Sequence, residues 1–300
     1  MSKDAFAGFH PSINMLYFVA VIGFSMFFMH PVNLSISLVC ACSYSIYLNG
    51  KRTVRMGLMV MLPMLVITAL LNPLFNHQGA TILAYLPNGN PVTLESTAFG
   101  IMASVMLIAV ISWFSCFNVV MTSDKFVYLL GRAIPALSLI LAMSLRFVPR
   151  FRAQIKIVLN AQKCIGRDAA NGNLLQRAKH GIKILSIMVT WALENAIETA
   201  DSMKSRGYGL PGRTAFSIFR FDKRDALAMA YISVCIAIIV AGAVLEVYRF
   251  RYFPTIRHIR GDFSVFWRSA LFAVYFALCV FPLAVNIRED IIWKRIESKI

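Results

Sequence analysis

Long apolar runs constrain the fold of this 300-residue chain more than any other feature. A helix needs about 20 apolar residues to cross the hydrocarbon core of a bilayer. Runs near that length lie at 13–29, 34–48, 56–71, 97–120, 226–247 and 263–285. The chain is 58% hydrophobic and 15% charged, whereas soluble proteins average roughly 45–50% apolar and about 25% charged residues. The sequence therefore predicts an all-α, polytopic membrane protein with about six transmembrane helices.

Positive charge is concentrated in one part of the chain. The net charge is +16, and residues 146–224 hold fifteen Lys and Arg against five Asp and Glu. Basic residues of membrane proteins gather in segments that stay in the cytoplasm, so we expect a cytoplasmic module beside a plasma-membrane domain, and no nucleic-acid partner. Residues 72–96 contain no Lys or Arg and many Asn, Pro and Gly, which predicts a turn-rich segment on the outer side.

Two segments conflict with this predicted topology. Residues 126–145 are apolar, but a span there would export the basic block, and Gly131, Arg132 and Pro135 interrupt it. We therefore expect a helix at the cytoplasmic interface rather than a further span. The loop between the last two spans falls outside, although its basic residues favour the cytoplasm. Those residues are Arg249, Arg251, Arg257 and Arg260, and nothing in the sequence removes the conflict.

Three segments follow from this pattern: N-terminal transmembrane helices (1–125), a cytoplasmic module of long amphipathic coupling helices (126–224), and C-terminal transmembrane helices with a tail (225–300). One face of the first long helix carries Phe151, Ile155, Val158, Gln162 and Ile165. The second helix carries residues spaced three and four apart, which predicts a seam where coupling helices pack. The seam residues are Leu175, Ala178, Ile182, Leu185, Val189, Ala192, Ala196, Thr199 and Met203.

Both long helices end in a small cluster with glycine. Ser205-Arg206-Gly207 is typical of a helix stop, because Gly provides a left-handed cap and Arg suits the negative helix end. The arginine also suits a carboxylate-lined groove on a partner, since its donors form a rigid fork. The two interpretations are compatible. Cys164-Ile165-Gly166, followed by Arg167, ends the first helix in the same way, and two such ends predict a paired docking surface.

Residues that could carry chemistry are weakly clustered elsewhere. The five histidines are scattered, without the spacing of metal ligands. The cysteines fall mostly in apolar runs, where they are expected to pack as small hydrophobic residues. Gly50-Lys51 lacks the other residues of a phosphate-binding loop. Glu194 and Glu198 lie one helical turn apart, which favours a solvated or Lys-paired face over an acid–base pair. We expect no catalytic site, no cofactor and no metal.

Several of these segments together resemble the transmembrane T component of energy-coupling factor (ECF) transporters, the ATP-driven importers of vitamins and of nickel or cobalt. Helices on both sides of a cytoplasmic coupling module extend the resemblance over most of the chain. The segments that carry it are Leu145-Arg146-Phe147-Val148-Pro149, Ala161-Gln162-Lys163 with Gly166, Met203-Lys204-Ser205-Arg206-Gly207-Tyr208-Gly209, and Gly212-Arg213-Thr214.

The resemblance implies a non-catalytic permease subunit with two kinds of partner. Two ABC ATPases dock on Ala-Arg-Gly-like motifs, and a separate S component in the membrane binds the substrate. Ser205-Arg206-Gly207 matches the second motif, with Ser for Ala. The first motif falls on Cys164-Ile165-Gly166, where Ile165 takes the arginine position. Arg167 lies two residues further on, and its side chain is rotated by roughly 200° about the helix axis.

Two other function classes stay open at this point. A stand-alone membrane transporter or signalling protein would use the basic block to bind anionic lipid, for which clustered Lys and Arg are enough. It predicts equal losses for any charge reversal in the block, whereas docking predicts a special role for Arg206. An intramembrane enzyme would need a buried catalytic group in a span, and Glu246, its main acidic candidate, lies at a helix end.

Overall fold

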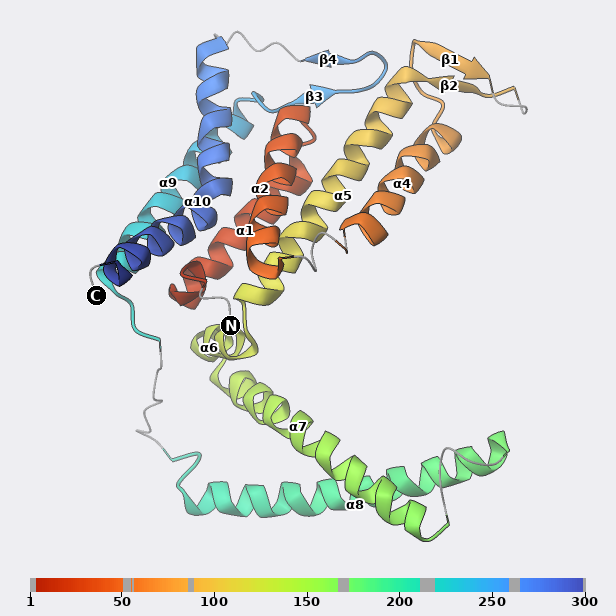
Figure 1. Cartoon of the computed structure of the whole chain (residues 1–300), viewed down its shortest axis with the longest axis vertical. Helices are drawn as coiled ribbons and strands as arrows, with labels where there is room; N and C mark the ends of the chain where they lie inside the picture. Colours follow the sequence, from red (N-terminus) through yellow and green to blue (C-terminus); the bar gives the residue numbers. More distant parts are fainter. Residues whose placement is uncertain are drawn as a thin grey trace. The chain divides into compact units, whose positions relative to one another are not determined.

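The apolar runs fold as helices in a computed structural model, which describes residues 4–50, 55, 57–85, 89–166, 173–210, 219–258 and 265–298. The chain forms two compact units (Figure 1). The apolar unit comprises Met1–Thr122 and Phe219–Ile300, and the basic unit comprises Ser123–Ile218. The segments predicted as N-terminal and C-terminal transmembrane helices therefore lie together in the apolar unit.

Long helices that run back and forth make up most of the described part of the apolar unit (Figure 1). A 3-10 turn, η1 (Phe6–Gly8), precedes α1, and a π-helical turn, η2 (Gly57–Met61), leads into α4. The helices are α1 (Pro11–Phe27), α2 (Pro31–Asn49), α4 (Leu62–Phe75), α5 (Leu94–Val120), α9 (Lys223–Val244) and α10 (Val265–Glu297). Each of the six apolar runs thus contains a helix.

Histidine–proline pairs begin the first two helices. Pro11 and Pro31 occupy the first turn, where proline needs no N–H partner. The Nδ1 atom of His10 accepts a hydrogen bond from the Ser12 N–H (3.3 Å), and that of His30 accepts one from the Val32 N–H (3.2 Å). The scattered histidines of the sequence therefore include two helix caps.

The core of the apolar unit is aromatic and carries its own polar contacts. Tyr17, Trp113 and Tyr275 are fully buried. The Trp113 Nε1–H donates to Ser37 Oγ (2.9 Å), and the Tyr17 hydroxyl donates to the Cys279 carbonyl (3.1 Å), so these buried polar groups are satisfied. The packing role predicted for the cysteines is confirmed for Cys40, Cys116, Cys235 and Cys279, which are buried and free.

Two short antiparallel hairpins lie in the connections of this otherwise helical chain. β1 (Ile82–Tyr85) pairs with β2 (Pro91–Thr93), and β3 (Phe250–Arg251) pairs with β4 (Arg257–His258). The two hairpin regions contact each other: the N–H of Ala80, just before β1, donates to the carbonyl of Pro254, between β3 and β4 (3.0 Å). The segment predicted as turn-rich therefore forms a hairpin, whose strands are too short and irregular to show a two-residue period in the sequence.

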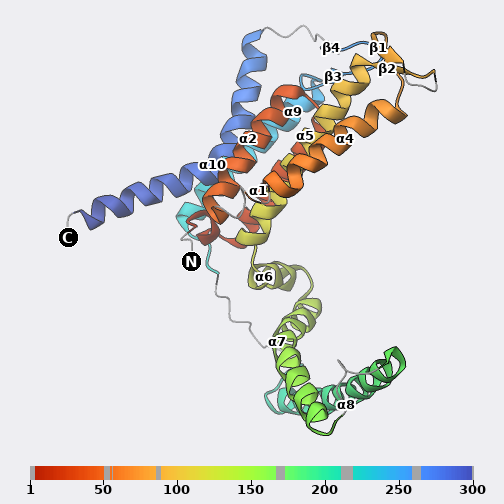
Figure 2. The same cartoon turned by 45° about the vertical axis from the view of Figure 1, so that its right-hand side comes forward.

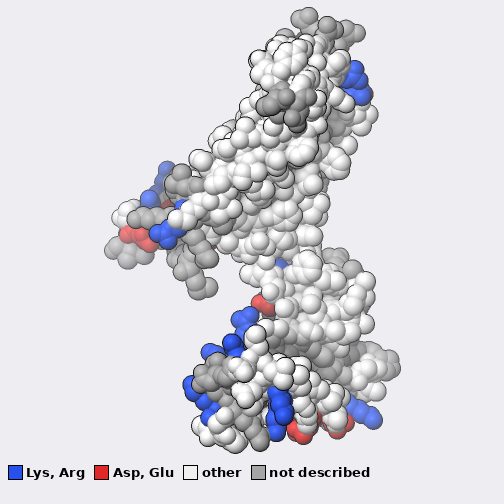
Figure 3. All heavy atoms as spheres, turned by 90° about the vertical axis from the view of Figure 1, so that its right-hand side faces the viewer, with Lys and Arg blue, Asp and Glu red and all other residues white. Residues whose placement is uncertain are grey.

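Length and composition support a multi-pass membrane protein. Of the described helices, α2, α5, α9 and α10 are long and apolar enough to cross a bilayer, and the shorter apolar helices are Pro11–Phe27 and Met59–Phe75. On the face drawn in Figure 3, the middle of the apolar unit is almost free of charged side chains. Charged residues lie toward its ends, as expected when hydrocarbon surrounds the middle.

Arg251 and Arg257, which lie between the last two spans, belong to the β3–β4 hairpin at one end of the apolar unit; Arg260 lies outside the described residues. The chain enters and leaves the basic unit at the other end, where α5 finishes and α9 begins (Figures 1 and 2). Arg249 forms an ion pair with Glu246, which offsets one of these charges. Arg251 is exposed. The β3–β4 hairpin and the connections to the basic unit therefore lie at opposite ends of the apolar unit (Figures 1 and 2).

The basic unit contains α6 (Ser123–Ala133), α7 (Pro135–Cys164) and α8 (Leu174–Ser205). Residues 126–145 do not form the single helix that the sequence predicts. The chain breaks at Ile134, near the predicted interruption, and Pro135 then starts a helix that continues through the first predicted coupling helix. Proline at the first helical position favours such a restart because its φ angle already suits a helix.

Candidate functional site

The two long helices of the basic unit contact each other through a small apolar cluster. Its buried residues are Val158, Ile184 and Met188, with Phe151, Ile187 and Trp191 packed against them. The rings of Phe151 and Trp191 meet edge to face, with centroids 5.3 Å apart. The Arg150 guanidinium lies 5.7 Å from the centre of the Trp191 ring, which is within the range of a cation–π contact. Phe151 and Val158 thus pack on the predicted face of the first helix.

The structure corrects the packing seam predicted on α8. Leu175 is 86% exposed and Ile182 is 68% exposed, and Leu185 and Val189 are also exposed. The face that contacts α7 carries Ile184, Met188 and Trp191, about 100° around the helix from the predicted stripe. α8 is apolar on more than one face, so spacing alone could not identify the contacting one.

The C-terminal end of α8 holds Ser205-Arg206-Gly207 in a glycine-capped turn. The helix ends at Ser205, Arg206 is the C-cap, and Gly207 has a φ of 74°. The Gly207 N–H donates to the Lys204 carbonyl (3.0 Å), and the Tyr208 N–H donates to the Met203 carbonyl (3.1 Å). These two bonds satisfy carbonyls that a helix end leaves unpaired. The predicted helix stop is confirmed, and it leaves Ser205 and Arg206 exposed.

The end of α7 has a similar form. The helix ends at Cys164, Ile165 is the C-cap, and Gly166 has a φ of 76°. The Gly166 N–H donates to the Lys163 carbonyl (3.0 Å). Cys164 and Ile165 are exposed. Ile165 and Arg206 therefore hold equivalent positions on two helix ends, whereas Arg167 and the Gly212-Arg213-Thr214 motif lie outside the described residues.

A cleft of about 490 Å³ lies between the two helices, beside the end of α8. It brings together two of the segments singled out in the sequence, Leu145–Pro149 and Met203–Gly209. Three arginine side chains line it, with Glu198 as the acidic lining residue, so the cleft favours anionic groups. The charged and aromatic lining residues are Arg146, Phe147, Arg150, Glu198, Arg206 and Tyr208.

Carboxylates are the ligands that this arrangement suits. Arginine binds a carboxylate through two parallel hydrogen bonds, and Arg206 stands on a turn whose backbone is fixed by its cap. No group of three or more His, Cys, Asp and Glu that could hold a metal ion occurs among the described residues.

The sequence analysis missed Arg150 as a member of this site. The available signal was its spacing: Arg146 and Arg150 lie four residues apart, so they share one helix face. The contact of that face with the end of α8 depends on how α7 and α8 cross, which the sequence does not contain. Thr199 and Met203 are the members of the predicted seam that line the cleft.

Several known proteins similar to part of this chain are transmembrane proteins of energy-coupling factor transporters. No protein-family model matches the chain. The chain is 33% identical over 105 residues to the energy-coupling factor transporter transmembrane protein EcfT of Lactobacillus helveticus. The aligned residues cover 35% of this chain and 38% of that relative. The chain is 35% identical over 105 residues to EcfT of Lactococcus lactis, 35% of this chain and 40% of the relative.

A longer match covers more of the chain at lower identity. An uncharacterized Mycoplasma pneumoniae protein, the MG181 homolog, is 29% identical over 180 residues, 55% of this chain and 42% of that protein. The chain thus spans about two fifths of the length of each of these relatives. Over the third of its length that matches EcfT, the chain is related to the transmembrane T components of energy-coupling factor transporters.

Proposed function

We propose that this chain is the energy-coupling transmembrane subunit of an ATP-driven ECF importer. The similarity to EcfT proteins supports this proposal. The observation that carries it is the exposed Arg206, held on a glycine-capped helix end beside a cleft lined by Arg146 and Arg150. A rigid cationic end of this kind suits recognition of a protein groove more than loose attraction to a charged surface.

In this proposal the ends of α7 and α8 dock on two ABC ATPases in the cytoplasm. Ser205-Arg206-Gly207 inserts its arginine among carboxylates of one ATPase. Cys164-Ile165-Gly166, with Arg167, contacts the other. Because Ile165 occupies the position equivalent to Arg206, the first dock offers an exposed apolar side chain where the second offers a cation. The two ATPase contacts therefore differ in their chemistry.

The length of the helices suits the transmission of motion. α7 has 30 residues and α8 has 32, so each is about 45 to 48 Å long at 1.5 Å per residue. The basic unit joins the apolar unit in the inner membrane at two points of the chain, after α5 and before α9. ATPase movement would thus pull on two different membrane helices. A separate S component in the membrane would bind the vitamin or transition-metal ion.

ATP hydrolysis is assigned to the partners and not to this chain. The proposed subunit is non-catalytic and holds no cofactor. Its contribution is mechanical, since the binding energy of the arginine contact couples closure of the ATPases to displacement of α7 and α8. The identity of the cargo depends on the S component.

Co-purification from membranes tests the docking. The chain is co-expressed with the ABC ATPases of its own organism, and Arg206→Glu is compared with Lys183→Glu, an exposed cation on the same helix. We expect Arg206→Glu to reduce co-purified ATPase by about thirty-fold or more, because it leaves like charges opposed in a buried contact. Lys183→Glu should retain the ATPases. Unchanged co-purification of Arg206→Glu would contradict docking, and equal losses in both variants would favour a basic block that binds anionic lipid.

A further inference from the structure

The last helix bends and continues well beyond the apolar run. Pro282 lies inside α10, and proline cannot donate the hydrogen bond that would hold a helix straight. Residues 283–297, here named the C-terminal arm, leave the direction of the first part of α10 (Figures 1 and 2). The tail that the sequence presents as a separate polar end is thus a helical extension of the apolar unit.

Two arginines of this arm share one face. Arg288 and Arg295 are seven residues apart, so they project from one face, about two turns from each other. The same face carries Ala284, Val285, Ile291 and Ile292. The acidic residues Asp290 and Glu297 project from the opposite face, next to Asp4 and Lys294. Glu289 lies between the two faces, since it lines a groove with Arg288 as well as the opposite face. The arm therefore has one largely apolar face whose cations are Arg288 and Arg295, with Glu289 at its edge.

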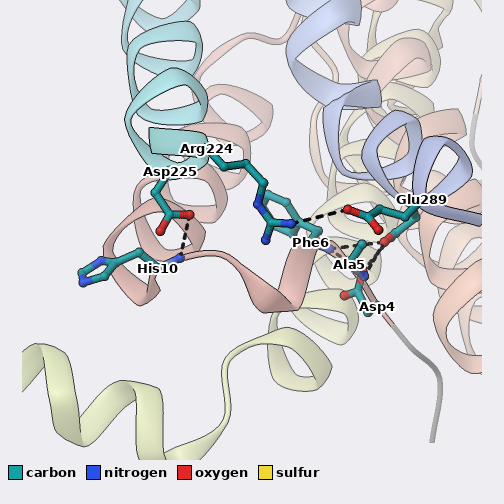
Figure 4. Close-up of polar contacts among 8 residues, drawn as sticks. Asp4, Ala5, Phe6, His10, Arg224, Asp225 and Glu289 are labelled. Atoms are coloured by element: carbon teal, nitrogen blue, oxygen red, sulfur yellow. Dashed lines mark hydrogen bonds and ion pairs between the residues drawn. The ribbon is translucent and has the colours of Figure 1, made fainter. Parts of the chain in front are cut away.

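Contacts to the rest of the apolar unit fix the acidic face. Asp290 accepts a hydrogen bond from the Tyr47 hydroxyl (2.8 Å), and Glu289 pairs with Arg224 at the start of α9 (3.4 Å; Figure 4). Asn286 Oδ1 accepts the Ala5 N–H (2.7 Å). Since these bonds set the rotation of the arm, Arg288 and Arg295 stay exposed. Neither forms an ion pair within the described part of the chain.

Two apolar grooves meet at Arg288. One, of about 410 Å³, lies between α9 and α10 and is lined by Leu227, Tyr231, Phe281 and Arg288 among others, together with the ion pair of Arg224 and Glu289. The other, of about 600 Å³, runs along α10 past Val280, Ile287, Arg288, Ile291 and Arg295. The second groove is apolar toward the membrane-spanning part of α10 and cationic toward the arm. In the first groove Glu289 is paired with Arg224, which leaves Arg288 as the cation without a carboxylate of the described residues at 4 Å or less.

We propose that this surface binds the headgroup of an anionic phospholipid, with its acyl chains in the two grooves. Arginine forks suit phosphate oxygens, and basic pockets between membrane helices are the sites that anionic headgroups take. A free phosphate would leave the apolar grooves unfilled, whereas a phospholipid fills both parts. In this proposal the arm lies at the membrane surface as an amphipathic helix.

Native mass spectrometry of the full chain tests the site. Purified protein is offered equal amounts of phosphatidylglycerol and phosphatidylcholine with the same acyl chains, and the ratio of the two adducts is measured. The double variant Arg288→Gln/Arg295→Gln is compared with Lys294→Gln, which removes a cation from the opposite face of the same arm. We expect the double variant to lower the preference for phosphatidylglycerol about thirty-fold, the equivalent of about 2 kcal/mol for two cations.

Lys294→Gln should keep the preference of the unaltered chain. An unchanged preference in the double variant, or an equal loss in Lys294→Gln, would overturn the proposal, the latter because it would indicate general charge attraction. Displacement of phosphatidylglycerol by millimolar inorganic phosphate would overturn the lipid as the occupant. All substituted residues are exposed, so the variants should keep the size-exclusion profile and melting temperature of the parent. These outcomes do not depend on the docking of ATPases.

Discussion

At the residue scale, the shape of the α8 end depends on Gly207. Its φ of 74° lies in the left-handed region, and a Cβ atom there would lie 3.2 Å from Leu210 Cδ1. Gly207→Ala should lower the free energy of unfolding by about 1 kcal/mol, because an L residue is strained in this conformation. Thermal unfolding of the purified chain would detect the loss.

Gly181 provides the matched control for this substitution. It lies inside α8, and an added Cβ would meet nothing within 4 Å. Gly181→Ala should raise the free energy of unfolding by about 0.5 to 1 kcal/mol, since alanine is the better helix former. If both variants shift the melting temperature in the same direction, the capping role of Gly207 is wrong.

Tyr252 links the hairpin end to the α1–α2 loop. Its hydroxyl donates to the Met29 carbonyl (2.8 Å), and burial raises the pKa of this phenol to about 12. A raised folded-state pKa means that the neutral phenol stabilises the fold below pH 10, and that this contribution is lost as the pH rises from 10 through about 12.

Absorbance at 295 nm measures this tyrosine. In the difference between titrations of the unaltered chain and Tyr252→Phe, the missing tyrosinate signal should rise near pH 12. A missing signal centred near pH 10 would show that the phenol is not buried. The variant should also lower the free energy of unfolding by about 1 kcal/mol at neutral pH, because it removes one hydrogen bond.

At the element scale, the apolar runs predicted helices well because a helix in a membrane must satisfy its own backbone. Pro31 starts α2 three residues before its predicted start, and the predicted interruption near Pro135 falls beside the α6–α7 break. Hairpins, helix crossings and the arm of α10 depend on contacts between distant residues. The seam on α8 was misplaced for that reason: periodicity describes an apolar face, but not which neighbour covers it.

The apolar contact between α7 and α8 gives a prediction that compares two isoleucines of α8. Ile184 is 9% exposed and contacts the α7 cluster, whereas Ile182 is 68% exposed. Ile184→Ala should lower the free energy of unfolding of the basic unit by about 2 kcal/mol, and Ile182→Ala should change it by less than about 0.5 kcal/mol. Hydrogen exchange of the α8 amides, compared between the two variants, would report this difference. A larger effect for Ile182→Ala would restore the seam predicted from the sequence.

At the scale of the whole molecule, the two units have different proposed roles. The apolar unit supplies membrane helices with charged residues toward their ends, and the basic unit supplies exposed helix ends and a cationic cleft. The central claim is that the basic unit faces the cytoplasm and carries the ATPase contacts. Cys164 is the exposed one of the six cysteines and lies at the end of α7, so it reports directly on this claim.

The decisive measurement is the rate at which a membrane-impermeant maleimide labels Cys164, with Cys164→Ser as the blank. Inverted vesicles should label readily when the ATPases have been stripped and slowly when they are bound, and right-side-out vesicles should not label at all. Labelling from the outer side, or one labelling rate with and without bound ATPases, would contradict the account.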